Sequence, residues 1–162
     1  MEKVKYNKWE SVAFSGHRFV SLKDRKNLKE KLREQIRLSY AAGIRNFYCG
    51  MAIGFDLMAA EEVYAMSHIY PDMKLIAVIP HMGQTQKWKD KDKLRYSELL
   101  NAADEVIFLS RHYYDGCLLR RNDYMLAHAK EVIAYFDGTP KGGTFYTCRK
   151  AQSMGMKVVN LF

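Results

Sequence analysis

The sequence contains little cysteine, little proline and no long hydrophobic run. Its 162 residues include three Cys, three Pro and ten Gly, too few for a disulfide-rich, linker-rich or fibrous protein. No apolar stretch approaches the roughly 18–20 residues that span a bilayer, and the N-terminal residues include no apolar core of a secretory signal peptide. We therefore expect a soluble cytoplasmic protein that does not bind membranes and keeps its cysteines reduced.

Motifs that mark several enzyme classes are also missing. Cys49, Cys117 and Cys148 form no C-x-x-C pair, and no spacing of ligands is typical of a zinc site. The chain has no Walker A loop, no G-x-G-x-x-G fingerprint and no G-x-S-x-G elbow, which argues against a P-loop ATPase, an NAD enzyme and a serine hydrolase. We predict that the protein holds no metal and no cofactor.

What is present is an ordinary globular composition with excess positive charge. Hydrophobic residues make up 48% of the chain, charged residues 27%, and the net charge is +8. These values predict one domain spanning residues 1–162. Residues 1–45 hold twelve Lys/Arg against five Asp/Glu, and within 21–42 Leu28, Leu32, Ile36 and Tyr40 recur on one helical face. The basic remainder of that helix is either a solvated surface, which we favour, or a site for phosphates or nucleic acid.

Short apolar runs alternate with helical patterns along the whole chain. The runs cover 11–15, 46–49, 74–79, 105–109, 131–136 and 157–161, and the helical patterns cover 21–42, 55–69, 84–102, 119–129 and 144–154. Because the runs are apolar throughout, both faces of each strand should be buried, as in parallel sheets. We predict a Rossmann-like three-layer α/β/α fold, with a mostly parallel sheet of six strands in the order 3-2-1-4-5-6.

Most glycines follow a predicted strand and therefore fall in loops at the carboxyl edge of the sheet. They group at Gly16, at Gly50 with Gly54, and at Gly142 with Gly143. Glycine lets backbone N–H groups approach a phosphate closely, and a following helix adds the positive end of its dipole. Three such clusters at one edge predict a ligand site there.

Side chains beside the first two clusters add chemistry to this edge. Ser15, His17 and Arg18 offer a hydroxyl, an imidazole and a guanidinium suited to a phosphate. Asp56 begins the helix after Gly54. Its carboxylate either complements the helix dipole or accepts hydrogen bonds from a ribose or base.

The loops after the fourth and fifth strands complete the predicted site. Arg120 or Arg121 can meet a phosphate, and Tyr113 or Tyr114 can stack on a base. Thr144 follows Gly142 and Gly143 at the start of the last helix, which is an anion-binding arrangement. If the sheet reverses its order at the fourth strand, the loop after that strand lies beside the first.

Taken in order, these segments resemble the YpsA-like family of the SLOG superfamily, a bacterial-type family, over nearly the whole chain. The resemblance rests on S-G-H-R at 15–18, G-M-A-I-G-F-D-L-M-A-A-E at 50–61, a glutamine–tryptophan segment around Gln86, Ala103 with Asp104 before a strand, and D-G-x-x-x-G-G-T at 137–144. The second segment is also similar to the S-G-x-A-x-G-I-D segment of the DNA-processing protein DprA. The resemblance implies a Rossmann-like fold that binds a nucleotide or nucleotide-derived ligand through Ser15, Gly16, His17, Arg18, Gly50, Gly54, Asp56, Gly142, Gly143 and Thr144.

One departure from the related enzymes bears on catalysis. The LOG phosphoribohydrolases carry P-G-G-x-G-T-x-x-E, whose final Glu is catalytic, whereas no acid follows Thr144 in this chain. Asp56 and Glu61 are the candidate substitutes for that acid. We therefore expect N-glycosidic hydrolysis to be absent or weak.

Three functions follow from this sequence. The first is a binding protein or sensor for a nucleotide-like small molecule such as AMP or an ADP-ribose-type ligand. The alternatives are a LOG-like hydrolase acting on a nucleoside monophosphate and a DprA-like module that binds nucleic acid through the basic first helix and aromatic stacking. The sequence leaves the formation of homo-oligomers open.

Overall fold

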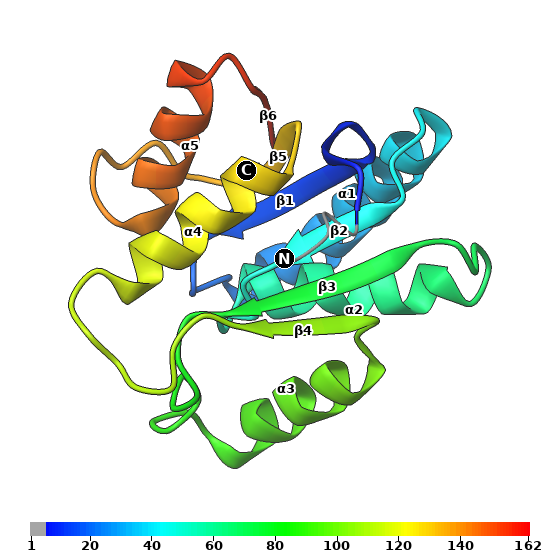
Figure 1. Ribbon diagram of the computed structural model, residues 1–162. Coiled ribbons are helices and arrows are strands. Elements are labelled where there is room, and N and C mark those ends of the chain that lie inside the picture. The colour runs from blue at the N-terminus through cyan, green and yellow to red at the C-terminus, as the bar shows by residue number, and fades with distance from the viewer. Residues whose placement is uncertain (1–5) are drawn as a thin grey trace.

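The computed structural model describes residues 6–162 and contains a six-stranded sheet between two layers of helices (Figure 1). A short 3₁₀ helix, η1 (Lys8–Glu10), precedes the first strand. The strands are β1 (Ser11–Gly16), β2 (Asn46–Cys49), β3 (Lys74–Ile79), β4 (Glu105–Phe108), β5 (Glu131–Tyr135) and β6 (Lys157–Asn160). The helices are α1 (Leu22–Ala41), α2 (Phe55–Ser67), α3 (Asp90–Ala102), α4 (Cys117–His128) and α5 (Gly143–Ser153).

The strands alternate with the helices and run in one direction, which confirms the Rossmann-like three-layer prediction. The observed order is β4-β3-β2-β1-β5-β6, and all five pairs are parallel. The predicted order was therefore wrong in one respect: the fourth strand lies beside the third and not beside the first. Because crossovers are right-handed, a helix on the same face as its predecessors carries the chain onward in the same direction. Helix α3 packs on the face that α1 and α2 cover, so the order reverses one strand later, at β5.

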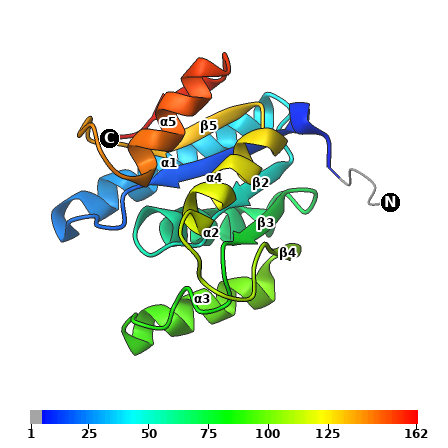
Figure 2. The ribbon, with the colours of Figure 1, turned by 60° about the vertical axis from the view of Figure 1, so that its left-hand side comes forward.

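Each face of the sheet has its own hydrophobic core. Alternate residues of β1 point to opposite faces: Val12 and Phe14 pack with α1 and α2, whereas Ala13 packs beneath α4. Figures 1 and 2 show α4 and α5 together on one side of the sheet, with α1 and α2 on the other. Both faces of the central strands are therefore buried, as continuous apolar runs predict.

Two helices show how well the hydrophobic periodicity of the sequence located helices. In α1, Leu28, Leu32 and Ile36 are buried as predicted. Helix α3 begins at Asp90, six residues after the predicted start at 84. The intervening segment forms successive turns, such as the bond from the N–H of Trp88 to the carbonyl of Thr85 at 2.9 Å.

Neither a membrane helix nor a metal cluster is found in the part of the chain that the structure describes. No helix within 6–162 is both long and apolar enough to cross a bilayer. Over the same residues, no three His, Cys, Asp or Glu side chains are grouped to hold a metal ion. The three cysteines are free and buried.

Candidate functional site

A cavity of about 400 Å³ lies at the carboxyl edge of the sheet. In Figure 1, β1, β3 and β4 point to the left, and the loops after the strands gather at that end. The cavity walls come from the segments that follow β1, β2, β4 and β5. The loop after β4 reaches this place although two strands, β3 and β2, lie between β4 and β1. It does so because α4 crosses back over the sheet and begins at the same edge, with Cys117 at the cavity wall.

The loop after β1 is anchored on both sides of the cavity. The backbone N–H of His17 donates to the carbonyl of Tyr135 at 3.2 Å, and its carbonyl accepts from the N–H of Phe55 at 3.1 Å. The His17 Nε2 lies 2.9 Å from the backbone N of Asp137 and 3.1 Å from the Asp137 Oδ1. His17 thus connects the first loop to the fifth.

Asp56 forms part of the cavity floor and is only 5% exposed. Its Oδ2 accepts a hydrogen bond from the N–H of Ala52 at 3.2 Å. Its Oδ1 is buried and has no partner among the described residues. Burial raises the pKa of this carboxyl to about 6, while the charge of Arg121 and the Ala52 N–H act in the opposite direction. A carboxylate held ready in this way can accept hydrogen bonds from hydroxyl groups of a ligand.

Arg121 is also buried at the cavity and is largely committed to the protein. Its Nη1 donates to the carbonyl of Gly50 at 2.6 Å, and its Nε donates to the Asn122 Oδ1 at 2.9 Å. Burial lowers the pKa of this guanidinium, and the neighbouring Asp56 charge opposes the shift. Gly50 is required beneath it, because a Cβ there would lie 2.5 Å from the Arg121 Nη1.

Gln84, from the loop after β3, braces the same backbone. Its Nε2 lies 3.3 Å from the carbonyls of Gly50 and Met51 and donates to them. Met51 has a φ of 59°, a left-handed conformation that costs energy in a residue with a side chain. The clamp of Gln84 and Arg121 on this turn holds the strained backbone and thereby positions the N-terminus of α2.

The fifth loop leads directly into α5, whose N-terminus faces the cavity. Gly142 is the N-cap with a φ of 93°, a conformation that favours glycine. Gly143 and Thr144 line the wall, and an added Cβ at Gly143 would meet only the Asn122 Nδ2, at 3.7 Å. The first N–H groups of a helix have no intrahelical acceptor, and the dipole favours negative charge there. This wall can therefore bind an anion.

The family model of YpsA, described as the YspA SLOG family, matches residues 12–159. The chain belongs to the YpsA family of SLOG proteins. The match includes every predicted site residue and confirms the resemblance inferred from the motifs.

Curated relatives of this SLOG chain are bacterial proteins named UPF0398. The protein from Halalkalibacterium halodurans is 25% identical over 121 residues, which cover 74% of this chain and 64% of the relative. The protein from Bacillus velezensis is 24% identical over 127 residues, covering 77% of this chain and 70% of the relative. The chain thus matches slightly less than two thirds of the first relative's length.

A solved structure shares the fold. DNA processing protein A from Helicobacter pylori, described for its single-stranded DNA binding mode, superposes with a TM-score of 0.61 and 21% sequence identity. The superposition covers 95% of this chain and 65% of that chain. At 21% sequence identity this similarity supports the Rossmann-like fold and does not identify a ligand.

The structure brings most of the predicted site residues together. The cavity is lined by Ser15, Gly16, His17, Arg18, Asp56, Arg121, Gly142, Gly143 and Thr144. Gly50 and Gly54 support it from outside, since a Cβ at Gly54 would collide with the backbone carbonyl of Arg18. Glu61 does not line it; its carboxylate binds Arg95 at 2.6 Å on the outer part of α2.

Other residues that line or brace the cavity were not singled out from the sequence. Asn122 and Lys141 line the cavity, and Gln84 braces it. Of the two tyrosines proposed to stack on a base, Tyr113 lines the wall, whereas the Tyr114 hydroxyl accepts from Arg120 at 3.0 Å. Asn122 follows Arg121 in sequence, but only the packing of α4 on β1 places its amide in the cavity. No local signal marked it.

Proposed function

We propose that this SLOG chain binds a nucleotide or nucleotide-derived ligand, of the AMP or ADP-ribose type, in the carboxyl-edge cavity. The observation that carries this proposal is Asp56, which lines the cavity and whose buried Oδ1 has no hydrogen-bond partner in the described chain. A buried polar atom without a partner is costly and is retained where a ligand satisfies it. The free N-terminus of α5 on another wall supplies the complementary anion site.

The two walls divide the ligand between them. The phosphate binds the N–H groups of the Gly142–Thr144 turn, with the Thr144 hydroxyl and the Lys141 ammonium nearby. The ribose hydroxyls donate to Asp56, whose carboxylate is ionised above its pKa of about 6. The exposed ring of Tyr113 gives the base an aromatic surface at the cavity mouth.

We infer binding rather than hydrolysis because the cavity offers a single acid. Asp56 is the one carboxylate among the described lining residues. At the position where the LOG pattern carries its Glu, this chain has Thr147, which is 1% exposed and faces the core. Cleavage of a glycosidic bond needs a group to protonate the base and a group to stabilise the charge on the sugar. One buried Asp held against Ala52 serves recognition better.

Titration calorimetry with AMP, ADP-ribose, adenosine and inorganic phosphate tests the proposal. We expect AMP and ADP-ribose to bind and adenosine to bind at least about tenfold more weakly, because it lacks the phosphate. Gly143→Val should abolish binding without unfolding the protein, since its Cβ has room but its methyl groups enter the anion site. Ser153→Val places a valine side chain at the exposed far end of α5, and this variant should bind the nucleotides as the wild type does. Absence of binding of all four compounds at millimolar concentration would refute the proposal.

Single-stranded DNA is the second candidate, and the fold of the Helicobacter pylori protein is the observation that favours it. A DNA site predicts an affinity that falls steeply with salt, because each neutralised phosphate releases counterions. Binding of a single nucleotide in the cavity depends much less on salt, because a mononucleotide carries few charges. Repeating the titrations with a twelve-nucleotide DNA strand at two salt concentrations separates the two functions.

A further inference from the structure

Two further depressions continue from the cavity along the same edge. One has a volume of about 630 Å³ and is lined by the loop after β3, including His81, Gln84 and Trp88. The next, of about 610 Å³, lies between the start of α1 and the start of α3. Six cations line this last depression, and we call it the cationic groove: Arg18, Arg25, Lys87, Lys89, Lys91 and Arg95.

The cavity, the middle depression and the cationic groove adjoin one another. Arg18 lines all three. Tyr113 and Leu118 line both the cavity and the middle depression, and Lys87 and Trp88 line both the middle depression and the groove. A ligand that fills the cavity can therefore extend outward along this edge into the neighbouring depressions.

Most of the charge of the groove is not neutralised by the protein. Five of its six cations form no ion pair with a carboxylate within residues 6–162. The sixth, Arg95, is paired with Asp92, the acid in the groove, at 3.0 Å and with Glu61 at 2.6 Å. Cations on the outer face of α1 differ: Arg37 binds Glu34 at 2.6 Å, and Arg33 binds Glu62 at 3.3 Å. Unpaired cations converging on a concave surface favour a polyanionic ligand over a merely solvated face.

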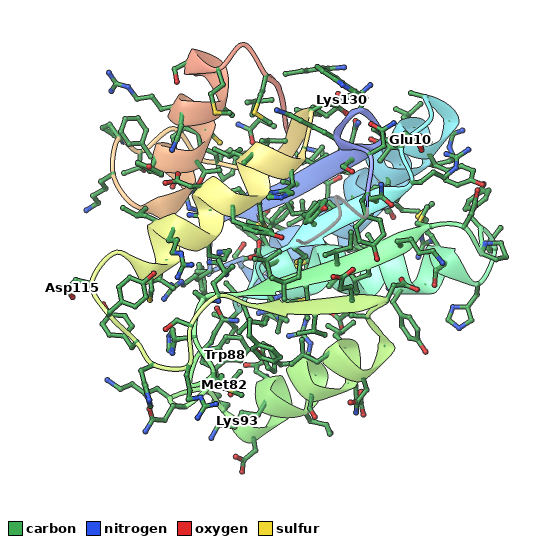
Figure 3. All side chains as sticks on the ribbon, in the orientation of Figure 1. Glu10, Met82, Trp88, Lys93, Asp115 and Lys130 are labelled. Atoms are coloured by element: carbon green, nitrogen blue, oxygen red, sulfur yellow. The ribbon has the colours of Figure 1, made fainter. Side chains whose placement is uncertain are left out.

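Aromatic rings lie among these cations. Trp88 stands edge-on to Tyr96, with ring centroids 5.4 Å apart, and this contact holds the indole at the start of α3 (Figure 3). Phe19 is 78% exposed at the other wall of the groove. Aromatic rings between cations are the arrangement that binds a nucleic acid strand, because bases stack on the rings while phosphates meet the cations.

We infer that the ligand does not end in the cavity: a second, phosphate-linked nucleotide unit lies in the cationic groove. This inference rests on the proposed function and extends it, since the cavity holds the first unit. The cations bind the additional phosphate, and Trp88 stacks on the second base. The ligand class is accordingly a dinucleotide or a longer oligonucleotide rather than a mononucleotide.

The fluorescence of Trp88 provides a local test. The chain has two tryptophans, and the other, Trp9, belongs to η1 before β1. Glu10, its neighbour, lies at the opposite end of the sheet from Trp88 in Figure 3. Trp9→Phe therefore leaves one tryptophan, in the groove. We expect the 5′-phosphorylated dinucleotide of deoxyadenosine to quench its emission and AMP to leave it nearly unchanged.

Affinities provide the second test. The dinucleotide should bind at least about tenfold more tightly than AMP. The double variant Lys87→Ala, Lys91→Ala should remove most of that gain and keep the affinity for AMP. The control Lys23→Ala, Lys26→Ala removes the same charge from exposed positions of α1 that do not line the groove, and should change neither affinity. A twelve-nucleotide strand tests whether the ligand is a nucleic acid or a free dinucleotide. Tighter binding of this strand than of the dinucleotide identifies nucleic acid, and equal binding identifies a free dinucleotide.

The outcomes separate this inference from the proposed function. Equal affinities for AMP and the dinucleotide, with no quenching of Trp88, would overturn the inference and leave the cavity as a mononucleotide site. Failure of AMP and ADP-ribose to bind would overturn the proposed function. Dinucleotide binding that the Lys87/Lys91 variant abolishes would then still support the groove.

Discussion

At the residue scale, Asp56 shows how the proposed binding site opposes stability. Its carboxyl group is buried with one oxygen unpartnered, and burial raises its pKa to about 6. The folded protein therefore binds this proton more tightly than the unfolded chain does. Such a residue weakens the fold at neutral pH, and a ligand that satisfies it recovers the loss.

Asp56→Asn should stabilise the protein at pH 8 and abolish nucleotide binding. A pKa of about 6 against an ordinary value of 3.8 corresponds to a gain of up to roughly 3 kcal/mol when the charge is removed. The protonated Asp56 contributes its full stability to the wild type below about pH 4, and this contribution is lost as the pH rises through 6. The stability gained by Asp56→Asn should therefore vanish at acid pH. Urea unfolding of both proteins between pH 4 and 8 measures it. A difference that does not change with pH would show that Asp56 does not titrate in this range.

Gly50→Ala should destabilise the protein although Gly50 does not touch the cavity. The added Cβ would lie 2.5 Å from the Arg121 Nη1 and would displace a buried guanidinium from its carbonyl acceptor. We expect a loss of roughly 3 kcal/mol, because a buried charge then lacks its partner. Gly143→Ala is the matched control, since an added Cβ there meets nothing closer than 3.7 Å. Equal unfolding free energies of the two variants would contradict this account of Gly50.

At the scale of the element, α1 and α5 differ in how the charge of their sequence relates to their surroundings. The basic face of α1 is largely a solvated surface, whose arginines pair with Glu34 of α1 and Glu62 of α2. Helix α5 carries no acid in its sequence, and its N-terminus faces the cavity. The surface that a helix presents to its neighbours therefore indicates its role better than its net charge does.

Because α5 lacks an acid, AMP incubated with the protein should yield no free adenine. The neutral side chains of Tyr146 and Thr147 cannot stabilise positive charge on the sugar, and Arg149 would oppose it. Chromatography of the incubated nucleotide detects adenine directly. Release of adenine at a rate that Asp56→Asn abolishes would make the protein a hydrolase with Asp56 as its acid.

At the scale of the whole molecule, the site joins segments that are otherwise linked only through the sheet. Four loops, spread from residue 15 to residue 144, contribute to one cavity. A ligand that contacts several of them binds the folded state alone and stabilises it by mass action. Binding and unfolding are therefore coupled across most of the chain.

AMP should raise the melting temperature of the wild type and leave that of Gly143→Val unchanged. At a concentration 100 times the dissociation constant the stabilisation is about 2.7 kcal/mol, which corresponds to a shift on the order of 5–10 °C for a chain of this size. Calorimetric scans with and without AMP measure it. An equal shift in the variant would place the nucleotide elsewhere on the molecule.

The sequence by itself determined the elements and their class. The continuous apolar runs predicted all six strands to within one residue, because a strand buried on both faces needs apolar side chains at every position. The glycines after the strands located the carboxyl edge, since these turns need positive φ or close backbone approach. Ser15, Arg18, Asp56 and Thr144 followed from their places beside those turns.

Only the tertiary structure decided the strand order and the depth of the site. The place of β4 in the sheet depends on which face of the sheet α3 covers. Strand β4 is short and half-buried, and its sequence does not indicate which strand lies beside it. The clamp of Gln84 and Arg121 on Gly50, the position of Asn122 and the unpartnered oxygen of Asp56 all arise between segments distant in sequence. The cationic groove arises in the same way, because Arg18 and Arg25 meet Lys87, Lys89 and Lys91 only after α1 and α3 pack on one face of the sheet. Burial and charge neighbours are properties of the packed chain, and local sequence patterns do not contain them.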